Sequence, residues 1–535
     1  MRSSNFDILL NRISLFLIIS LILFAYFNSL LIGLSWDENF HHVNGLLRFK
    51  YLSSLGKFQD YDWLNNKYYP GLYDTISYAI GHILQVFDEN FYQKHFVEIK
   101  HSINFLFSVF SLLGLYLTLN FLFNKSISLL AVLLTLLNPF FFGHMGMNPK
   151  DIIIFFSLIW FCYFFYKYLF YEKNIYFNLV FASFFAGFGC GVRISFLAVI
   201  FPVLICGLIY LFNKSKDNYS DMIKRLFFHF AIALIFILFL TLICWPHIYQ
   251  DSLSLLFSII KNSINWYAGT RLGLIDGIFY ETHKTPPSYF LDMLKFKMPF
   301  FLSILMFFSY ILFFINNNPL IKIVTNFNIK FIIVNSIIFF PIIISIIFTV
   351  KIYDYLRLFI FILPFISLLA SFSLYYLLIS FNESFNSKLG IFLILFFFII
   401  FFYRFVSLLP YQYSYVNFSY PQIKDSINKF EHDYWGTSLK ELVVKIKNKY
   451  SQSEIDKIKF GICGGDIVAL RFYLNKDLSV SNIYNLNDST HIIMINRASF
   501  NVNDKTTCFN KHRGVDLVSV TRDHLLLSVL REKMN

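Results

Sequence analysis

Long apolar stretches, separated by short polar breaks and by two longer polar segments, run from residue 13 to residue 409. A helix of about twenty apolar residues crosses the hydrocarbon core of a bilayer. On that criterion the pattern predicts eleven transmembrane helices and hence a polytopic α-helical membrane protein. The predicted spans lie near residues 13–34, 102–123, 126–143, 151–170, 175–191, 195–212, 226–246, 299–316, 331–350, 358–380 and 389–409.

The pattern changes in the tail, residues 410–535. The stretch "SLKELVVKIKNKY" (438–450) has apolar residues at helical spacing, and "KIKFGIC", "HIIMINRA" and "GVDLVSV" have the character of short strands. We therefore expect a membrane domain over residues 1–409, with outer loops at about 35–101 and 247–298, and a small α/β domain over 410–535.

The start of the tail helix carries a local signature. Thr437 or Ser438 is expected to cap it, with Glu441 as the capping-box partner. Just before it, Asp433 and Trp435 are expected to pack back towards the membrane domain. Because the tail shows no cluster of nucleophile and base, we predict a non-catalytic lid or docking module.

Composition supports the membrane assignment and excludes a soluble protein. Hydrophobic residues make up 57% of the chain, charged residues 14%, and the mean hydropathy is +0.59. A soluble chain of 535 residues could not bury that much apolar surface. The net charge of +13 is scattered among spans and loops without a basic stripe, so a nucleic-acid partner is not expected.

The short loops predict an orientation. Positive residues favour the cytoplasmic side, and they gather on one side of the predicted spans. The N-terminus is therefore expected in the cytoplasm, and the tail and both long loops outside it. The residues are Arg2, Arg12, Lys214, Lys216, Lys224, Arg225 and Lys388.

Two of the six cysteines lie in the tail. If the tail is outside the cytoplasm, Cys463 and Cys508 are in a compartment where disulfides persist. Two separate buried thiols are the alternative. The spacing of cysteines and histidines shows no zinc signature.

The first candidate catalytic residues lie in "GLSWDENF" (33–40), at the end of the first predicted span and directly after it. Asp37 and Glu38 form an acidic pair that His41 and His42 follow closely. If a helix starts here, Asp37 and His41 share one of its faces. A structural alternative is that Asp37 only caps this helix, with Glu38 in its first turn.

Three further polar clusters are predicted on the same outer side. "GHMGMNPKD" (143–151) is expected to form a tight turn that ends in Lys150 and Asp151, and "CGVRISF" (190–196) carries Arg193. "KIYDYLRLFIFILP" (351–364) carries Asp354 and Arg357. Ionisable residues at membrane depth are costly and so are functional candidates, although a snorkelling cation at the interface is the simpler explanation for each alone.

Together these motifs resemble a known family. "WDENFHH", "NPKDIIIFF", "GVRISF", "HKTPPSYFLDMLKFKMP" and "YDYLRLFIFILP", in this order, are similar to motifs of membrane glycosyltransferases with the GT-C fold. The likeness is to glycosyltransferase family 39, the protein O-mannosyltransferase and aminoarabinose-transferase group, over roughly residues 10–410. The chain departs from that pattern at Leu358, where a histidine or other polar residue often follows the arginine.

The resemblance implies a substrate and roles. Such enzymes move a sugar from a polyprenyl-phosphate carrier to a lipid, glycan or protein acceptor outside the cytoplasm, and this one is expected in a bacterial inner membrane. Asp37 matches the catalytic aspartate, which we expect to act as general base in an inverting transfer, with Glu38 as its catalytic partner. Cations for the donor phosphate are expected from Lys150, Arg193, Arg271, Lys297 and Arg357, with His41, His42, Asp151 and Asp354 in support.

No cofactor is predicted with certainty. A divalent metal cation is the one candidate, with Glu38, His41 and His42 as its conceivable ligands. Membrane lipids are expected partners of the spans.

Two other functions fit parts of the pattern. A transporter or flippase of lipid-linked envelope intermediates would line its path with the same charges, and a scaffold for an envelope complex would need no chemistry. The large tail and the lack of an inverted repeat disfavour the transporter. The acidic pair disfavours the scaffold. If the enzyme is right, Asp37, Lys150, Arg193 and Arg357 should converge on one cavity open to the outer leaflet.

Overall fold

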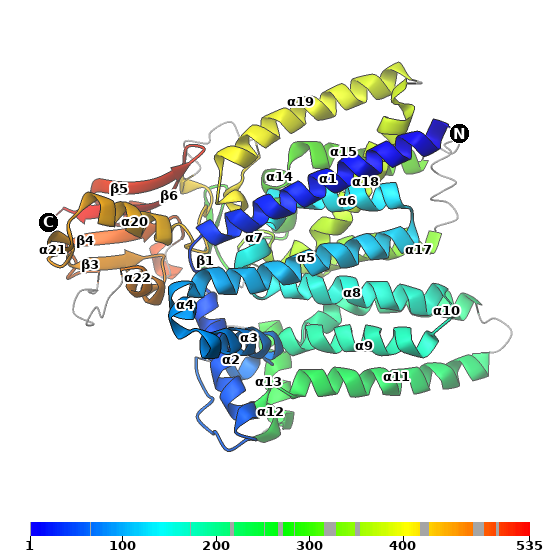
Figure 1. The fold of residues 1–535 in the computed structure, drawn as a ribbon, viewed down its shortest axis with the longest axis horizontal. Coiled ribbons are helices and arrows are strands. Elements are labelled where there is room, and N and C mark those ends of the chain that lie inside the picture. The colour runs from blue at the N-terminus through cyan, green and yellow to red at the C-terminus, as the bar shows by residue number, and fades with distance from the viewer. Residues whose placement is uncertain are drawn as a thin grey trace.

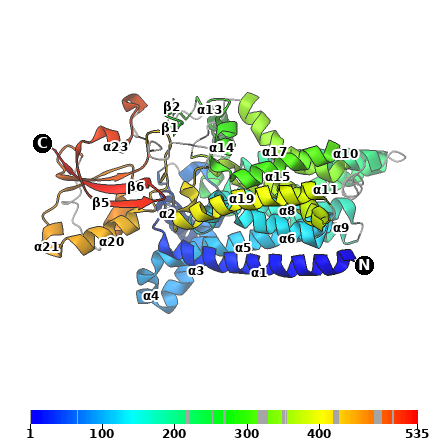
Figure 2. The same ribbon diagram turned by 90° about the horizontal axis from the view of Figure 1, so that it is seen from above.

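The computed structural model has a long helical body with a small β-sheet domain at one end (Figures 1 and 2). It describes residues 2–64, 66–171, 173–214, 219–250, 252–265, 271–282, 284–314, 328–347, 352, 354–382, 384–417, 427–474, 486–498 and 502–534. Lys216, one of the residues used for the orientation, lies outside these ranges.

Within the described ranges, eight helical segments are long and apolar enough to cross a membrane. Two pairs of helices join as bent segments, α6 (Lys125–Leu136) with α7 (Pro139–Met147) at 74°, and α14 (Tyr289–Lys297) with α15 (Phe300–Phe314) at 117°. A shorter apolar helix is α17 (Asn328–Ile347). The eight are α1 (Arg2–Leu31), α5 (Phe96–Leu122), α8 (Asp151–Phe170), α9 (Ile175–Val192), α10 (Phe196–Lys214), α11 (Tyr219–Leu242), η2 (Arg357–Ile362) continued by α18 (Leu363–Ile379), and α19 (Phe385–Ser407).

The fold class predicted from the sequence is confirmed: the chain is a polytopic α-helical membrane protein with a small C-terminal sheet. Each of the eleven predicted spans coincides with an apolar helix of the described chain, although length and composition qualify only eight to ten of these as spans. The number eleven therefore stays a prediction.

The expected span 126–143 and the tight turn after it differ from the structure. The helix breaks at Asn138, whose side chain accepts hydrogen bonds from the N–H groups of Phe140 and Phe141. Pro139 then occupies the first turn of α7, where its missing N–H costs nothing. As a result "GHMGM" is helical and buried, and the turn is confined to the residues just before α8.

Both long loops are at the same end of the helical body as the sheet domain (Figure 1). The first contains α2 (Glu38–Ser53), η1 (Asn66–Tyr68), α3 (Leu72–Phe87) and α4 (Glu89–Lys94). The second contains α12 (Pro246–Gln250), α13 (Ser252–Asn265) and a hairpin of β1 (Leu272–Ile275) with β2 (Ile278–Glu281). Sequence analysis missed this hairpin, although its Asp276–Gly277 turn has φ of +46° and +82° and Asp-Gly is a strong hairpin signal.

The tail is the α/β unit expected from its pattern. Its sheet has the order β3-β4-β6-β5, in which β3 and β4 are parallel and the other pairs antiparallel. The three predicted strands are present, and β6 was missed. The elements are η4 (Gln412–Ser414), α20 (Leu439–Lys449), α21 (Gln452–Ile455), β3 (Phe460–Cys463), α22 (Ile467–Tyr473), β4 (His491–Ile495), η7 (Val502–Asp504), α23 (Cys508–Lys511), β5 (Gly514–Arg522) and β6 (Leu525–Lys533).

The predicted capping box of α20 is wrong. Ser438 occupies the N-cap position, but its side chain makes no capping hydrogen bond. Instead the carboxylate of Asp433 accepts the N–H groups of Thr437 and Ser438, both at 3.1 Å. Glu441 is unavailable as a cap because it pairs with Arg522 at 2.7 Å.

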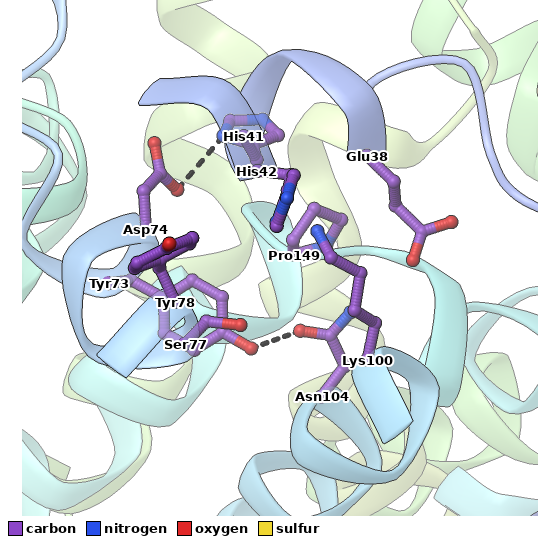
Figure 3. Close-up of a pocket in the computed structure, with 10 residues that line it drawn as sticks. All are labelled: Glu38, His41, His42, Tyr73, Asp74, Ser77, Tyr78, Lys100, Asn104 and Pro149. Atoms are coloured by element: carbon purple, nitrogen blue, oxygen red, sulfur yellow. Dashed lines mark hydrogen bonds and ion pairs between the residues drawn. The ribbon is translucent and has the colours of Figure 1, made fainter. Parts of the chain in front are cut away.

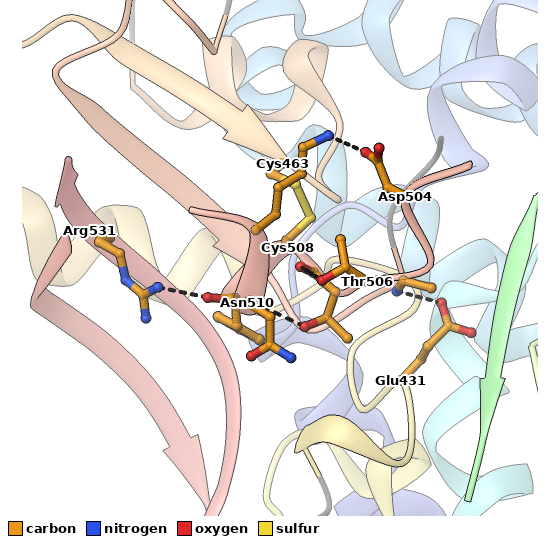
Figure 4. Close-up of a disulfide and its surroundings, with 11 residues drawn as sticks. Glu431, Cys463, Asp504, Thr506, Cys508, Asn510 and Arg531 are labelled. Carbon is orange, nitrogen blue, oxygen red and sulfur yellow. Dashed lines mark hydrogen bonds and ion pairs between the residues drawn. A yellow bond between two sulfur atoms is a disulfide. The ribbon is translucent and has the colours of Figure 1, made fainter. Parts of the chain in front are cut away.

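A disulfide joins Cys463, at the end of β3, to Cys508, at the start of α23, as Figure 4 shows. The disulfide prediction is confirmed over the alternative of two free thiols. The bond closes a long loop, because the two cysteines are 45 positions apart in the sequence. It therefore ties α23 and the segment before it to the parallel edge of the sheet.

Replacing both cysteines by serine should destabilise the tail by about 2–4 kcal/mol, because the open loop regains conformational freedom when the chain unfolds. The measurement is the rate of proteolysis within the tail of detergent-purified protein, with and without a reductant. Reductant should accelerate cleavage of the wild type and leave the Cys463→Ser/Cys508→Ser protein unchanged. Equal cleavage of all samples would contradict the expectation.

Candidate active site

The charged residues singled out from the sequence meet where the helical body borders the tail. Asp37 lies between α1 and α2, in the N-cap position of α2, but its side chain makes no capping hydrogen bond. Its carboxylate instead pairs with the guanidinium of Arg357, from the start of η2. The capping explanation therefore accounts for the position of Asp37 but not for its side chain.

Arg357 is the hub of the cluster. Its guanidinium is 2% exposed. Nε donates to Oδ2 of Asp151 at 2.7 Å, and Nη1 lies 4.0 Å from Oδ2 of Asp354. The ring of Trp435, from the tail, covers the guanidinium with its centroid 4.2 Å from Cζ. One buried cation thus connects three carboxylates from different parts of the chain.

The cluster extends to a second arginine through Asp151. Oδ1 of Asp151 accepts a hydrogen bond from Nη1 of Arg193 at 3.0 Å, and the Arg193 side chain is 19% exposed. Asp151 opens α8, so the helix dipole also favours its charge. Lys150 lies beside it, with Nζ 3.9 Å from the centroid of the Tyr69 ring.

These positive charges keep Asp37 ionised. Burial alone would raise the pKa of Asp37, but Arg357 and Lys150 outweigh this effect and hold it far below the ordinary value. The side chain is still 25% exposed, so a bound molecule can reach it.

The turn before η2 is conformationally unusual. Asp354 and Tyr355 have φ of +59° and +55°, which non-glycine residues seldom adopt. Consecutive left-handed residues of this kind are costly, and such strain gathers at functional sites. Here the turn aims Arg357 at Asp37 and Asp151.

A largely apolar cavity of about 220 Å³ adjoins the charged cluster. Asp151 and Arg193 are its charged lining residues. Most of the other lining residues are apolar side chains of α8, α10, α17 and η2, among them Phe196, Val199 and Phe340. The arrangement suits an amphiphile with an anionic head and a hydrocarbon chain.

Glu38 is turned away from Asp37. Its carboxylate accepts the N–H of Ser35 at 2.6 Å and lies 3.2 Å from Nε2 of His101. Those contacts fix the start of α2 against α5. The geometry gives no support to Glu38 as a partner of Asp37 in catalysis.

The three metal candidates line one small cavity, but each has other contacts. Glu38 contacts His101, His41 contacts Asp74, and the ring of His42 packs on those of Phe96 and Tyr78. Burial lowers the pKa of His42 to about 3, and Lys100 adds to the effect. Within the described ranges no group of three His, Cys, Asp or Glu side chains has the arrangement of a metal site.

Two further predicted phosphate ligands border the cluster and have other main contacts. Nη1 of Arg271 is 3.4 Å from the hydroxyl of Tyr434, at the boundary between the second loop and the tail. Lys297 is buried at the bend between α14 and α15, where Nζ is 3.5 Å from the carbonyl of Ser414. Of the predicted cations, the structure brings Lys150, Arg193 and Arg357 together.

The tail forms part of the wall of the site, and Trp435 packs against the membrane domain as predicted. Trp435 covers Arg357, and the N–H of Trp36 donates to the carbonyl of Trp435 at 2.9 Å. Arg497, which sequence analysis did not select, places its guanidinium 4.8 Å from the centroid of the Trp36 ring. Nothing near Arg497 in the sequence signals this contact, because it depends on how the tail docks.

Sequence analysis also missed Asp74. This residue of α3 contacts His41 of α2 at 2.9 Å, and both line a small cavity at the base of the first loop (Figure 3). The pairing depends on α2 and α3 packing as a hairpin, which periodicity alone does not specify.

Comparison with known proteins places this geometry in context. The family model described as dolichyl-phosphate-mannose-protein mannosyltransferase matches residues 77–245, less than half of the chain. The crystal structure of ArnT from Cupriavidus metallidurans bound to undecaprenyl phosphate aligns over 96% of this chain and 97% of that one, with a TM-score of 0.50 and 11% identity. The chain has the GT-C fold. This is the fold of membrane glycosyltransferases that the sequence motifs resemble.

The matching solved structures include two others. The apo form of the same ArnT covers 96% of this chain and 97% of that chain, with a TM-score of 0.50 and 12% identity. The oligosaccharyltransferase AglB from Archaeoglobus fulgidus, in complex with an inhibitory peptide and a dolichol-phosphate, covers 91% of this chain and 65% of that chain, with a TM-score of 0.48 and 10% identity. A comparison with curated proteins gave no match. The GT-C fold matched here is an architecture, and the chemistry has to be argued from the site.

Proposed function

We propose that this GT-C protein transfers a sugar from a polyprenyl-phosphate donor to an acceptor at the outer face of the membrane. The observation that carries the proposal is an apolar cavity whose charged lining residues, Asp151 and Arg193, belong to the Arg193–Asp151–Arg357–Asp37 chain of ion pairs. A polyprenyl-phosphate sugar likewise joins a hydrocarbon chain, a phosphate and a sugar. In this proposal the part of the hydrocarbon chain next to the phosphate enters the cavity, the phosphate faces the cations, and the sugar lies near Asp37.

The cations have a role in the leaving step. When the bond between the anomeric carbon and the phosphate oxygen breaks, the phosphate gains a negative charge. Lys150, Arg193 and Arg357 are placed to stabilise that charge, and stabilisation of developing charge is usually a large part of catalysis. The ArnT structure with undecaprenyl phosphate supports a lipid phosphate as the ligand of this fold.

Asp37 supplies the base. The hydroxyl of the acceptor attacks the anomeric carbon from the face opposite the phosphate, so the configuration inverts. Its proton passes to the carboxylate of Asp37. Phosphate binding to Arg357 and Lys150 would compete for the charges that lower the pKa of Asp37, and thereby make Asp37 a stronger base when the donor is present.

The cellular setting follows from the orientation predicted from the short loops. We infer a multi-pass protein of a bacterial inner membrane, with the N-terminus in the cytoplasm and the tail outside it. The acceptor is a lipid, a glycan or a protein of the envelope. The tail acts as a lid, since Trp435 contacts Arg357 and the tail places no carboxylate beside Asp37 within the described residues.

Undecaprenyl phosphate is the direct probe of the donor site. Arg193→Gln should weaken its binding at least about tenfold, because a charge-assisted hydrogen bond is worth about 1.5–3 kcal/mol. Binding can be measured by microscale thermophoresis of the detergent-purified protein. Arg225→Gln is the matched control, because Arg225 is exposed on α11 and outside the site. Equal affinity of wild type and Arg193→Gln would contradict the proposed phosphate site.

A further inference from the structure

A buried pair of histidine and carboxylate beside Asp37 has no assigned role in the reaction. Nδ1 of His41 lies 2.9 Å from Oδ1 of Asp74, and each side chain is 7% exposed. Burial alone would raise the pKa of Asp74, but His41 and a hydrogen bond from Asn44 lower it. The carboxylate of Asp74 therefore acts as an acceptor, which places a proton on Nδ1 of His41, so that the lone pair of the neutral imidazole is on Nε2.

The pair is held rigidly. Nδ2 of Asn44 donates to Oδ2 of Asp74 at 2.5 Å, and Nε of Arg48 donates to Oδ1 of Asn44 at 3.0 Å. The remaining N–H groups of the buried Arg48 donate to backbone carbonyls of Asn66, Tyr69 and Cys244. This network joins the first outer loop to the segment after α11 and fixes the orientation of the imidazole, as expected of a group that must transfer a proton in one direction.

Nε2 of His41 is buried and makes no hydrogen bond to any described residue. His41 lines a cavity of about 10 Å³, enough for one water molecule. Figure 3 shows α2 side chains on one side of this space and Lys100 of α5 on the other. The titratable groups that line the cavity with His41 are Glu38, His42, Tyr73, Asp74, Tyr78 and Lys100.

His41 also neighbours Asp37. The two are one helical turn apart, and the N–H of His41 donates to the carbonyl of Asp37 at 3.1 Å. Residues four apart share a helix face, with Cβ atoms about 5–6 Å apart. The imidazole thus lies close enough to interact electrostatically with the carboxylate of Asp37, and it also lines the water-sized cavity.

A protonated Asp37 has to lose its proton before the next turnover. We propose that His41, oriented by Asp74, accepts this proton from Asp37 through a bridging water and releases it through the cavity lined by Lys100 and Tyr78. This inference rests on the proposed function. The hydroxyl proton of the acceptor passes to Asp37 as the glycosidic bond forms, and the carrier phosphate leaves with the electron pair of its bond to the sugar. The proton then moves to Nε2, and the ionised Asp74 stabilises the imidazolium until water removes the proton.

The test is turnover of a synthetic donor by the full-length protein. Short-chain polyprenyl-phosphate pentoses and hexoses are first screened with the wild type, and the donor that it uses is taken for the test. His41→Gly and Asp74→Asn should each lower kcat by about 10²-fold, because proton transfer by a positioned group contributes about 10²–10⁴-fold. Since the two act as a unit, the double variant should be no slower than the slower single variant.

Chemical rescue separates proton transfer from a structural role. Added imidazole should restore turnover to His41→Gly and leave Asp74→Asn slow, while both variants bind undecaprenyl phosphate as the wild type does. His95→Gln, at the α4–α5 junction, is the control for histidine loss and should keep the wild-type rate. His41→Ala, which also leaves room for imidazole, replaces His41→Gly if the glycine protein does not fold.

The outcomes are distinguishable. If the wild type uses no donor, the proposed function fails and this inference fails with it. If the wild type turns over but His41→Gly and Asp74→Asn keep its rate, only the inference is wrong. Loss of turnover that imidazole does not restore, or equal loss of undecaprenyl phosphate binding, would also overturn it.

Discussion

Replacing Asp37 by asparagine should reduce sugar transfer by about 10²–10⁴-fold, because an amide cannot accept the proton of the acceptor hydroxyl. Folding should be retained, since Arg357 keeps its contact with Asp151. The measurement is the initial rate of polyprenyl phosphate release from a donor that the wild type uses, together with the elution profile of the purified protein.

The control distinguishes catalysis from helix capping. Asparagine caps helices as well as aspartate does, so a residue that only capped α2 would tolerate the change. Asp62→Asn removes a carboxylate from the same loop, where the side chain is 75% exposed, and should leave the rate unchanged. Full activity in Asp37→Asn would show that Asp37 is not the base.

Replacing Arg357 by methionine should cost both stability and activity. The change leaves the carboxylates of Asp37 and Asp151 without their shared cation, and breaking a buried ion pair costs about 3–5 kcal/mol. Arg357→Lys should be more stable than Arg357→Met yet transfer the sugar more slowly than the wild type. An ammonium is a single point of charge and does not bridge both carboxylates as the guanidinium does. Thermal unfolding and the initial transfer rate measure the two effects.

The loss of stability in Arg357→Met should depend on pH in a defined direction. Nearby cations lower the pKa of Asp37, so its ion pair stabilises the fold fully above the ordinary carboxyl pKa of about 3.9. The stability difference between wild type and Arg357→Met should therefore hold from pH 7 down to about 4 and narrow below that. Arg404→Lys, which alters a peripheral pair with Asp523 at 3.6 Å, should behave like the wild type. Wild-type activity in Arg357→Lys would exclude the bridging role.

Hydropathy and the positions of rare charges were enough to predict much of this arrangement. Asp37 and Arg357 are 320 positions apart, yet both follow from the expectation that polar breaks between spans gather at one membrane face. Apolar runs determine where the membrane helices form. Because charged side chains are costly inside the bilayer, the charges between these runs are expected at its surfaces. The same reasoning correctly grouped Lys150 and Arg193 with them.

Other parts of the site depend on side-chain direction and on docking between elements. Glu38 is adjacent to Asp37 in sequence, but successive residues of a helix point about 100° apart, and Glu38 contacts α5 instead. The contact of Asp74 with His41 requires the packing of α2 on α3. Trp435 reaches Arg357 only because the tail docks on the membrane domain, which a periodicity pattern does not encode.

The most direct measurement of the central claim is the fate of a polyprenyl-phosphate sugar added to proteoliposomes of the purified protein, with an envelope extract as the source of acceptors. Mass spectrometry would follow the sugar and the carrier. We expect free polyprenyl phosphate and a glycosylated product with inverted anomeric configuration, both absent with Asp37→Asn. A donor that crosses the bilayer with its sugar still attached, at the same rate in wild type and Asp37→Asn, would contradict the account and favour a flippase.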